Sequence, residues 1–231
     1  MPRFLKQFIY GVFYVTILGL VSWFIYQIYF PAPIPPAPCV TCNLKIESAE
    51  VIVLPLSEQT SSFLVKVKNP SSDYGLKKFN YQFKVFSKLG PAVKSVLGVS
   101  SLYPDEEKYI AVSNVNIAFA DIITVKFEPL DTPWQAKISF GPRSDVNITN
   151  THIENLDNFL SLTGQLANQS NQVFDNVSII AILKGDSDKI IAVSTLNLEN
   201  IKPQSKQEFR IFMPKVSYKE YIIYTDVLTA P

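Results

Sequence analysis

Hydrophobic residues are distributed in two different ways along the chain. From Phe8 to Phe30 they form one run, broken only by Thr16, Ser22 and Gln27, whereas farther along they mostly alternate with polar residues. As a helix rising ~1.5 Å per residue, the run is long enough to cross the ~30 Å hydrocarbon core of a bilayer. The pattern therefore predicts one N-terminal transmembrane α-helix, with residues 1–30 forming a cytoplasmic stub and the span.

The residues at the two ends of this run predict its orientation. Aromatic side chains lie near both ends, and we expect Phe8, Trp23 and Phe30 to act as membrane anchors at the interfaces. Arg3 and Lys6 precede the run, and basic residues stay on the cytoplasmic side. We therefore expect a single-pass cell-membrane protein with a cytoplasmic N-terminus and extracytoplasmic C-terminal domains. A cleaved signal peptide would also begin with basic residues, but this run exceeds the ~7–15-residue core of such peptides.

A proline-rich segment with a cysteine pair follows, at residues 31–42. Five of the eight positions from Pro31 to Pro38 are proline, which predicts an extended polyproline II spacer. The pair Cys39 and Cys42 has C-x-x-C spacing, but with two cysteines and one histidine in the chain a zinc site would lack ligands. We expect a disulfide between Cys39 and Cys42 in an oxidising compartment. A bridge between two chains and a thiol-disulfide redox function stay open as alternatives.

Beyond the cysteines the hydrophobic period is two, which is the period of β-strands. Alternation is clear over residues 63–68, 79–85 and 123–127 in the first part and over residues 160–166 and 177–183 in the second. The pattern predicts strands that are buried on one face, and the same reading makes Trp134–Phe140 a strand. Clusters of Asn, Pro, Ser, Asp and Gly separate the strands at the spacing of an antiparallel sandwich.

The second half of this region repeats the first. Asn69-Pro-Ser-Ser72 corresponds to Asn168-Gln-Ser-Asn171, and Leu102-Tyr-Pro-Asp-Glu106 corresponds to Ile201-Lys-Pro-Gln-Ser205. We place a boundary near Gly141-Pro142, which gives two modules of ordinary domain size, residues 43–141 and 142–231. The predicted fold class is all-β, with two tandem antiparallel Ig-like β-sandwich domains after the transmembrane helix.

The turn and strand motifs of the second module resemble a known group. Leu162-Thr-Gly164, Asn168, Phe174-Asp-Asn-Val177 and Ile201-Lys-Pro203 stand where FxLYD and late-embryogenesis-abundant-type (LEA14-like, WHy) modules of bacterial membrane-anchored envelope proteins have their motifs. Ala181-Ile-Leu-Lys-Gly185 replaces the name-giving Phe-x-Leu-Tyr-Asp, and Gln204 replaces the glycine after the proline. The first module resembles the group more loosely. The resemblance implies a non-catalytic Ig-like sandwich.

The sequence contains few residues that could catalyse a reaction or bind a metal ion or nucleic acid. A net charge of +1, with 18% charged residues, provides no electrostatic footprint for nucleic acid. His152 is the single histidine and has no nucleophile motif near it, and the acidic clusters Asp105–Glu107 and Asp186–Asp188 lack the spacing of a calcium loop. We predict no enzyme activity, no catalytic residue, no cofactor and no metal site.

The favoured function is the presentation of two β-sandwich modules outside the membrane, for protein–protein interaction or as part of the cell envelope. The expected partners are the lipid bilayer, through the N-terminal helix, and an envelope protein. The alternative is a module that binds carbohydrate or another envelope component. A thiol-disulfide redox protein is a third and weaker alternative.

Overall fold

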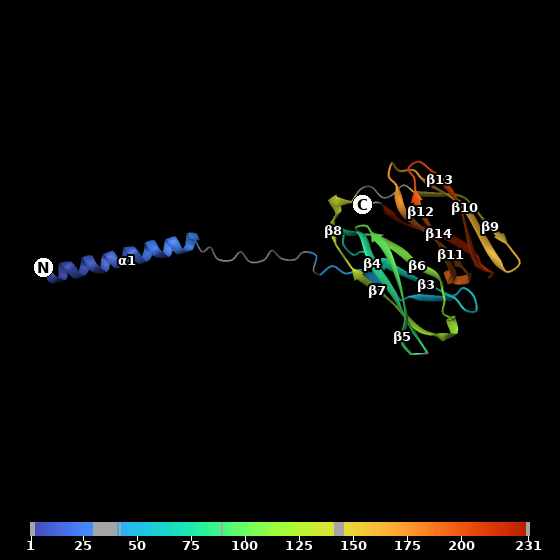
Figure 1. Cartoon of the computed structure of the whole chain (residues 1–231), viewed down its shortest axis with the longest axis horizontal. Coiled ribbons are helices and arrows are strands. Elements are labelled where there is room, and N and C mark those ends of the chain that lie inside the picture. The colour runs from blue at the N-terminus through green and yellow to red at the C-terminus, as the bar shows by residue number, and fades with distance from the viewer. Residues whose placement is uncertain (1–2, 30–40, 42, 89, 141–145, 230–231) are drawn as a thin grey trace. The chain divides into compact units, whose positions relative to one another are not determined.

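The computed structural model describes residues 3–29, 41, 43–88, 90–140 and 146–229. The chain divides into two compact units, Met1–Cys42 and Asn43–Pro231, each of which is described by itself (Figure 1). Phe30, the predicted spacer, Cys39 and Cys42 lie outside the described residues. So does the predicted boundary at Gly141-Pro142.

The first unit contains one helix, α1 (Arg3–Tyr29), which has no acidic residue in its first turn and no basic residue in its last. Every described side chain from Tyr10 to Phe24 is exposed, Trp23 included. The hydroxyl of Thr16 donates to the carbonyl of Val12 over 2.9 Å, so this polar group is satisfied within the helix. In the described part of the chain, no helix combines the length and the apolar character that a membrane crossing requires.

The second unit is all-β. Its first half, residues 43–140 and hereafter the N-half, contains β1 (Glu47–Ser48), β2 (Ile52–Pro55), β3 (Ser61–Lys68), β4 (Tyr74–Ser87), β5 (Gly90–Leu102), β6 (Glu107–Val115), β7 (Ile122–Asp131) and β8 (Gln135–Ala136). Its second half, residues 146–229 and hereafter the C-half, contains β9 (Val146–Asn155), β10 (Phe159–Asn168), β11 (Phe174–Lys184), β12 (Ile190–Ile201), β13 (Lys206–Pro214) and β14 (Glu220–Thr229). Short 3₁₀ turns lie at Phe119–Asp121, Lys137–Ser139 and Asp186–Asp188.

The two halves share one connectivity. In the N-half, β3 lies between β6 and the pair β1 and β2, while β4 lies between β5 and β7, with β8 pairing to the start of β4. In the C-half, β10 lies between β13 and β9, and β11 lies between β12 and β14. Every pairing among the described strands is antiparallel. The repeat seen in the sequence is therefore a repeat of strand order, with β3, β4, β5, β6 and β7 matching β10, β11, β12, β13 and β14.

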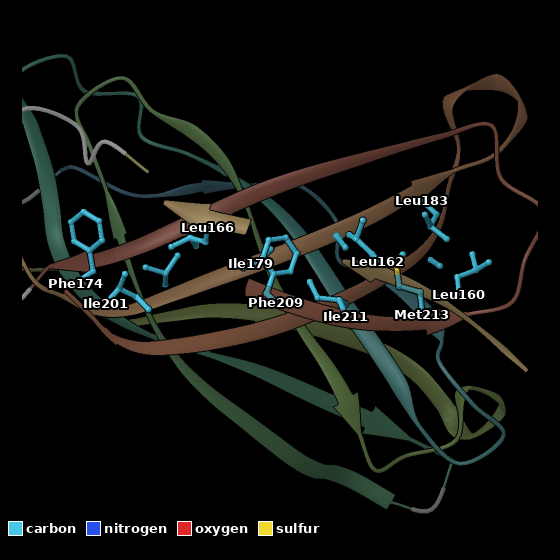
Figure 2. Close-up of a cluster of buried hydrophobic side chains, with 13 residues drawn as sticks. Leu160, Leu162, Leu166, Phe174, Ile179, Leu183, Ile201, Phe209, Ile211 and Met213 are labelled. Carbon is cyan, nitrogen blue, oxygen red and sulfur yellow. The ribbon is translucent and has the colours of Figure 1, made fainter. Parts of the chain in front are cut away.

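Each half has a hydrophobic core between its two sheets. In the C-half, Leu162 and Leu166 of β10 and Phe209 of β13 meet Ile179 and Leu183 of β11 (Figure 2). In the N-half the core is formed by alternate residues of β3 and β4 with partners from β5, β6 and β7. The residues predicted to face inward on β3, β4, β10 and β11 are buried, which confirms the alternation on these strands.

A third cluster joins the two halves. Leu54 of β2 and Leu64 of β3 pack with Ile180 and Ile182 of β11 and Val193 of β12. These residues point away from the core of their own half, so β3 is buried on both faces from Ser61 to Val65 and β11 from Ile179 to Leu183. The prediction of one buried face is wrong for these parts of the two strands, because their second face lies in the contact between the halves, whereas Lys66 and Lys68 of β3 are exposed as predicted.

The predicted strand Trp134–Phe140 is also wrong. Only Gln135 and Ala136 pair with β4, and the chain then turns through Lys137–Ser139. Ile138 is 95% exposed, so it contributes nothing to the core. Trp134 and Phe140 contact the N-half as side chains of a loop, since Trp134 packs on its core and the ring of Phe140 lies 5.2 Å from that of Tyr103.

Candidate interaction surfaces

Of the residues considered for chemistry, Glu106 and Glu107 make structural contacts through their side chains, and His152 makes one through its backbone. His152 lies on β9 opposite Thr163 of β10, and its carbonyl accepts a hydrogen bond from the Thr163 hydroxyl over 3.4 Å. Glu106 accepts from the backbone N–H of Tyr103 over 2.6 Å, and Glu107 pairs with Lys66 over 2.5 Å. Within the described ranges, no three His, Cys, Asp or Glu side chains gather in a way that would hold a metal ion.

Two buried asparagines hold equivalent turns in the two halves. The side-chain amide of Asn69 donates to the carbonyls of Tyr74 and Tyr103, at 2.7 and 2.9 Å. That of Asn168 donates to the carbonyls of Gln172 and Lys202, at 2.8 and 3.0 Å. Each asparagine is almost fully buried, so its hydrogen bonds replace those that water would make. The two asparagines that align the halves in the sequence therefore hold equivalent turns in the structure.

The turns that follow Pro104 and Pro203 are also equivalent. Asp105 and Gln204 have φ angles of 54° and 52°, in the left-handed region that glycine adopts most readily. Gln204 also makes hydrogen bonds through its side chain. Its side chain donates to the carbonyls of Gln169 and Ser170 at 2.6 and 3.2 Å, which ties this turn to the Asn168 turn.

A polar cluster ties the C-half to the N-half. The carboxylate of Asp226 on β14 accepts a hydrogen bond from the Ser100 hydroxyl over 2.6 Å and pairs with the Lys108 ammonium over 2.6 Å. The side chains of Lys108 and Asp226 are 11% and 9% exposed. The sequence does not reveal this cluster, because its members are far apart along the chain and belong to no motif.

Further contacts extend the junction on both sides of this cluster. The hydroxyls of Ser113 on β6 and Thr195 on β12 lie 2.8 Å apart, and Ser113 also accepts the backbone N–H of Thr195 over 3.1 Å. The rings of Tyr109 and Tyr224 lie 5.0 Å apart. With the apolar cluster, these contacts make residues 43–231 one compact unit.

Tyr81 lies in the N-half core close to this junction. Its ring stacks against Phe127 at 5.5 Å and covers Gly98 of β5, where a Cβ atom would collide with the tyrosine ring. Burial, with a smaller contribution from the negative charge of Asp226, raises the pKa of Tyr81 above its usual value. The phenol therefore stays neutral in the folded protein over the ordinary pH range.

The outer face of the N-half is polar along the middle of β4, while Leu97 and Val99 of β5 are exposed beside it. On β4, Gln82 and Lys84 point outward, and both contact Glu128 of β7, at 3.1 and 2.5 Å. The hydrogen bond from Lys84 lowers the pKa of Glu128. The equivalent positions of β11 are Ile180 and Ile182, which lie in the contact between the halves. The repeat is thus apolar where one half meets the other and polar on the outer face of β4.

The free edges of the sheets differ in how they are built. The pairings of β5, β6, β7, β9, β12 and β14 with their neighbours all contain register shifts. β2 is four residues long and ends at Pro55. Among the edge strands that the structure describes, β13 is the only one longer than four residues whose pairing runs without a shift. Bulges and short strands protect sheet edges from further pairing, as do prolines and charges. β13 ends at Pro214 and carries Lys206, Glu208 and Arg210, but its regular backbone makes it the edge best suited to accept another strand.

Comparison with known proteins adds no relative. No protein-family model matches the chain, and no curated protein matches it significantly.

Proposed function

We propose that this is a non-catalytic, single-pass membrane protein that presents a rigid pair of Ig-like β-sandwich domains outside the cytoplasm for contact with other envelope proteins. Since no described helix by itself has the length and apolar character of a span, the proposal rests on the apolar run of residues 8–30 in the sequence together with the surface of α1. Its described side chains from Tyr10 to Phe24 are exposed on all sides, and apart from the tyrosines only Thr16 and Ser22 among them are polar. A helix that is apolar all round is stable where its surroundings are apolar, and a bilayer provides such surroundings.

Charge supports the orientation. Arg3 and Lys6 are the only charged residues of α1 and lie in its first turn or next to it, which favours a cytoplasmic N-terminus. The proline-rich segment that follows α1 would hold the β-unit away from the lipid, and the proposed disulfide between Cys39 and Cys42 would close the linker in an oxidising compartment.

The β-unit supports a role in binding rather than in chemistry. Its polar side chains at the junction, Asp226, Lys108 and Ser100, are engaged in contacts between the halves. Its sheets end in exposed edges, and edge strands recruit partners by main-chain pairing. A rigid unit holds such an edge in a narrower range of orientations than two domains on a flexible linker would.

Membrane fractionation of cells that express the full-length chain tests the anchor. We expect the chain to resist alkaline carbonate and to be released by detergent, and external protease to cleave the β-unit in cells with a permeable outer layer. Leu18→Asp combined with Val21→Asp should move the chain into the soluble fraction, since each charge at mid-bilayer costs about 2.5–3.5 kcal/mol.

The matched control is Thr16→Ala combined with Ser22→Ala, which alters the same helix without adding charge. It should leave the chain in the membrane fraction. Release of the unaltered chain by carbonate, or protection of the β-unit from protease, would overturn the proposed anchor or its orientation.

A further inference from the structure

We propose that the β13 edge is a dimer interface, at which β13 of one copy pairs antiparallel with β13 of a second copy around a two-fold axis at Phe209. This goes beyond the proposed function and does not depend on the membrane anchor. The proposal rests on the regular edge of β13 and on the order of charges along it.

The free edge of β13 is defined by its existing contacts. Nine residue pairs join β10 to β13 without a shift, from Phe159 opposite Pro214 to Ala167 opposite Lys206. Ser194 of β12 donates its hydroxyl to the carbonyl of Phe212 over 2.9 Å, so this carbonyl points away from β10 and β12 already occupies the edge at Phe212. Because backbone groups of a strand alternate in direction, Lys206, Glu208 and Arg210 also turn their N–H and C=O groups towards the free edge. Figure 1 shows β13 next to β12 and β10 in the C-half.

The side chains of these same residues lie on the outer face of the sheet. Lys206, Glu208, Arg210 and Phe212 are exposed, while Phe209, Ile211 and Met213 are buried in the core. Figure 2 shows the side chains of Phe209, Ile211 and Met213 directed into the core, which leaves the charged residues on the opposite face. The outer face of β13 is thus basic, acidic, basic and aromatic in order along the strand.

This order is complementary to itself when the strand is reversed. In an antiparallel pair centred on Phe209, Glu208 of each copy lies opposite Arg210 of the other, which gives two ion pairs. Lys206 of each copy would lie opposite Phe212 of the other, but the Phe212 ring packs against Phe159 at 4.9 Å and its carbonyl is bonded to Ser194, so the two ion pairs carry the proposed contact. In each ion pair the backbone groups of both residues face the edge. The register that brings the opposite charges together is therefore also one in which these backbone groups can form hydrogen bonds.

The charges of β13 have no such counterparts across their own sheet. Gln165 of β10 lies opposite Glu208, and Thr163 lies opposite Arg210. Since both neighbours are uncharged, the alternation of charge on β13 does not serve pairing with β10. A two-fold pairing would use it and would extend each three-stranded sheet into one of six strands.

Charge reversal in the full-length chain tests the proposal in detergent solution, with a reductant present so that Cys39 and Cys42 cannot link copies. Sedimentation over a wide protein concentration series should show a reversible dimer of the unaltered chain. Glu208→Arg and Arg210→Glu should each raise the dimer dissociation constant by about tenfold or more, because both ion pairs become like-charge contacts.

Two combinations should restore the dimer. The double variant Glu208→Arg with Arg210→Glu exchanges the two charges, so each pair is again attractive. An equimolar mixture of the two single variants should form heterodimers, since one copy then carries arginine at both positions and the other carries glutamate at both. Neither variant should unfold the chain, because the neighbours of these positions on β10 are uncharged.

The matched control is Glu154→Arg, the same charge reversal on the outer face of the same sheet but on β9. It should leave the dissociation constant unchanged. A chain that is monomeric at every concentration would overturn the proposal. So would a dimer that both single variants leave intact, which would place the contact elsewhere. Membrane fractionation is a separate measurement, so failure of the anchor and failure of the dimer are distinguishable.

Discussion

The carboxylate of Asp226 is held by partners that come from the other half of the β-unit. Ser100 and Lys108 contact its two oxygens, both at 2.6 Å, in a site that excludes most water. A buried ion pair adds little net stability compared with apolar residues of the same size, but removing one partner leaves an uncompensated charge. The pair therefore acts mainly on specificity, because the buried charges are satisfied only when the halves meet in one way.

Lys108→Met tests this role. We expect the free energy of unfolding to fall by about 3–5 kcal/mol, because the Asp226 charge stays buried without its cation. The double variant Lys108→Met with Asp226→Leu should recover much of the loss. Urea unfolding of the full-length chain in detergent, followed by tryptophan fluorescence, measures both.

Lys66→Met is the control for that substitution. Lys66 pairs with Glu107, but the two side chains are 45% and 49% exposed, so the free energy of unfolding should stay close to that of the unaltered chain. Equal losses from Lys66→Met and Lys108→Met would contradict the role assigned to burial.

At the scale of the strand, β4 and β11 occupy equivalent places in the repeat, but their outward faces have different surroundings. The inward positions of both strands are apolar and buried in the core of their own half. The outward positions are Gln82 and Lys84 on β4, and Ile180 and Ile182 on β11. The difference follows from what each strand faces, since the outer face of β4 carries the ion pair to Glu128 and that of β11 lies against Leu54 and Leu64.

Exchanging these residues gives a second prediction. Ile182→Lys places an ammonium in the contact between the halves and should lower the free energy of unfolding by more than about 3 kcal/mol. Lys84→Ile at the equivalent position should change it far less, since it removes one partly exposed ion pair. Thermal unfolding of the two variants beside the unaltered chain measures the difference, and similar effects at both positions would disprove the assigned environments.

Alternation along the sequence identifies the strands and the inward residues of β3, β4, β10 and β11, because burial of one face imposes a period of two. It misses the burial of Leu64 on β3 and of Ile180 and Ile182 on β11, because an alternating pattern does not show what lies against the second face. It also misreads Trp134–Phe140, where alternation persists although Pro133 and the turn at Lys137–Ser139 leave only Gln135 and Ala136 paired. The junction cluster needs residues 100, 108 and 226 together, and only the folded chain brings them into contact.

At the scale of the β-unit, the two halves meet through unlike faces. The three apolar clusters lie between successive sheets, so the sheets containing β4, β3, β11 and β10 follow one another in that order. Contact between unlike faces can continue without limit when the repeat is exact. The outer faces here do not repeat the apolar contact between the halves, because one carries Gln82 and Lys84 beside Leu97 and the other carries Thr163 and Gln165 beside Phe159 and Phe212.

A core shared between the halves predicts one cooperative transition for residues 43–231. Leu64, Ile180 and Ile182 would be exposed if either half unfolded alone, so the partly unfolded state loses the contact as well as one core. Calorimetry of the full-length chain should give a single β-unit transition whose calorimetric and van't Hoff enthalpies agree. Ile182→Lys should separate it into two transitions, because each half keeps its own core while the contact is lost. Two transitions in the unaltered chain would show instead that the halves are thermodynamically independent, and the junction would then be a contact that orients the modules without stabilising them.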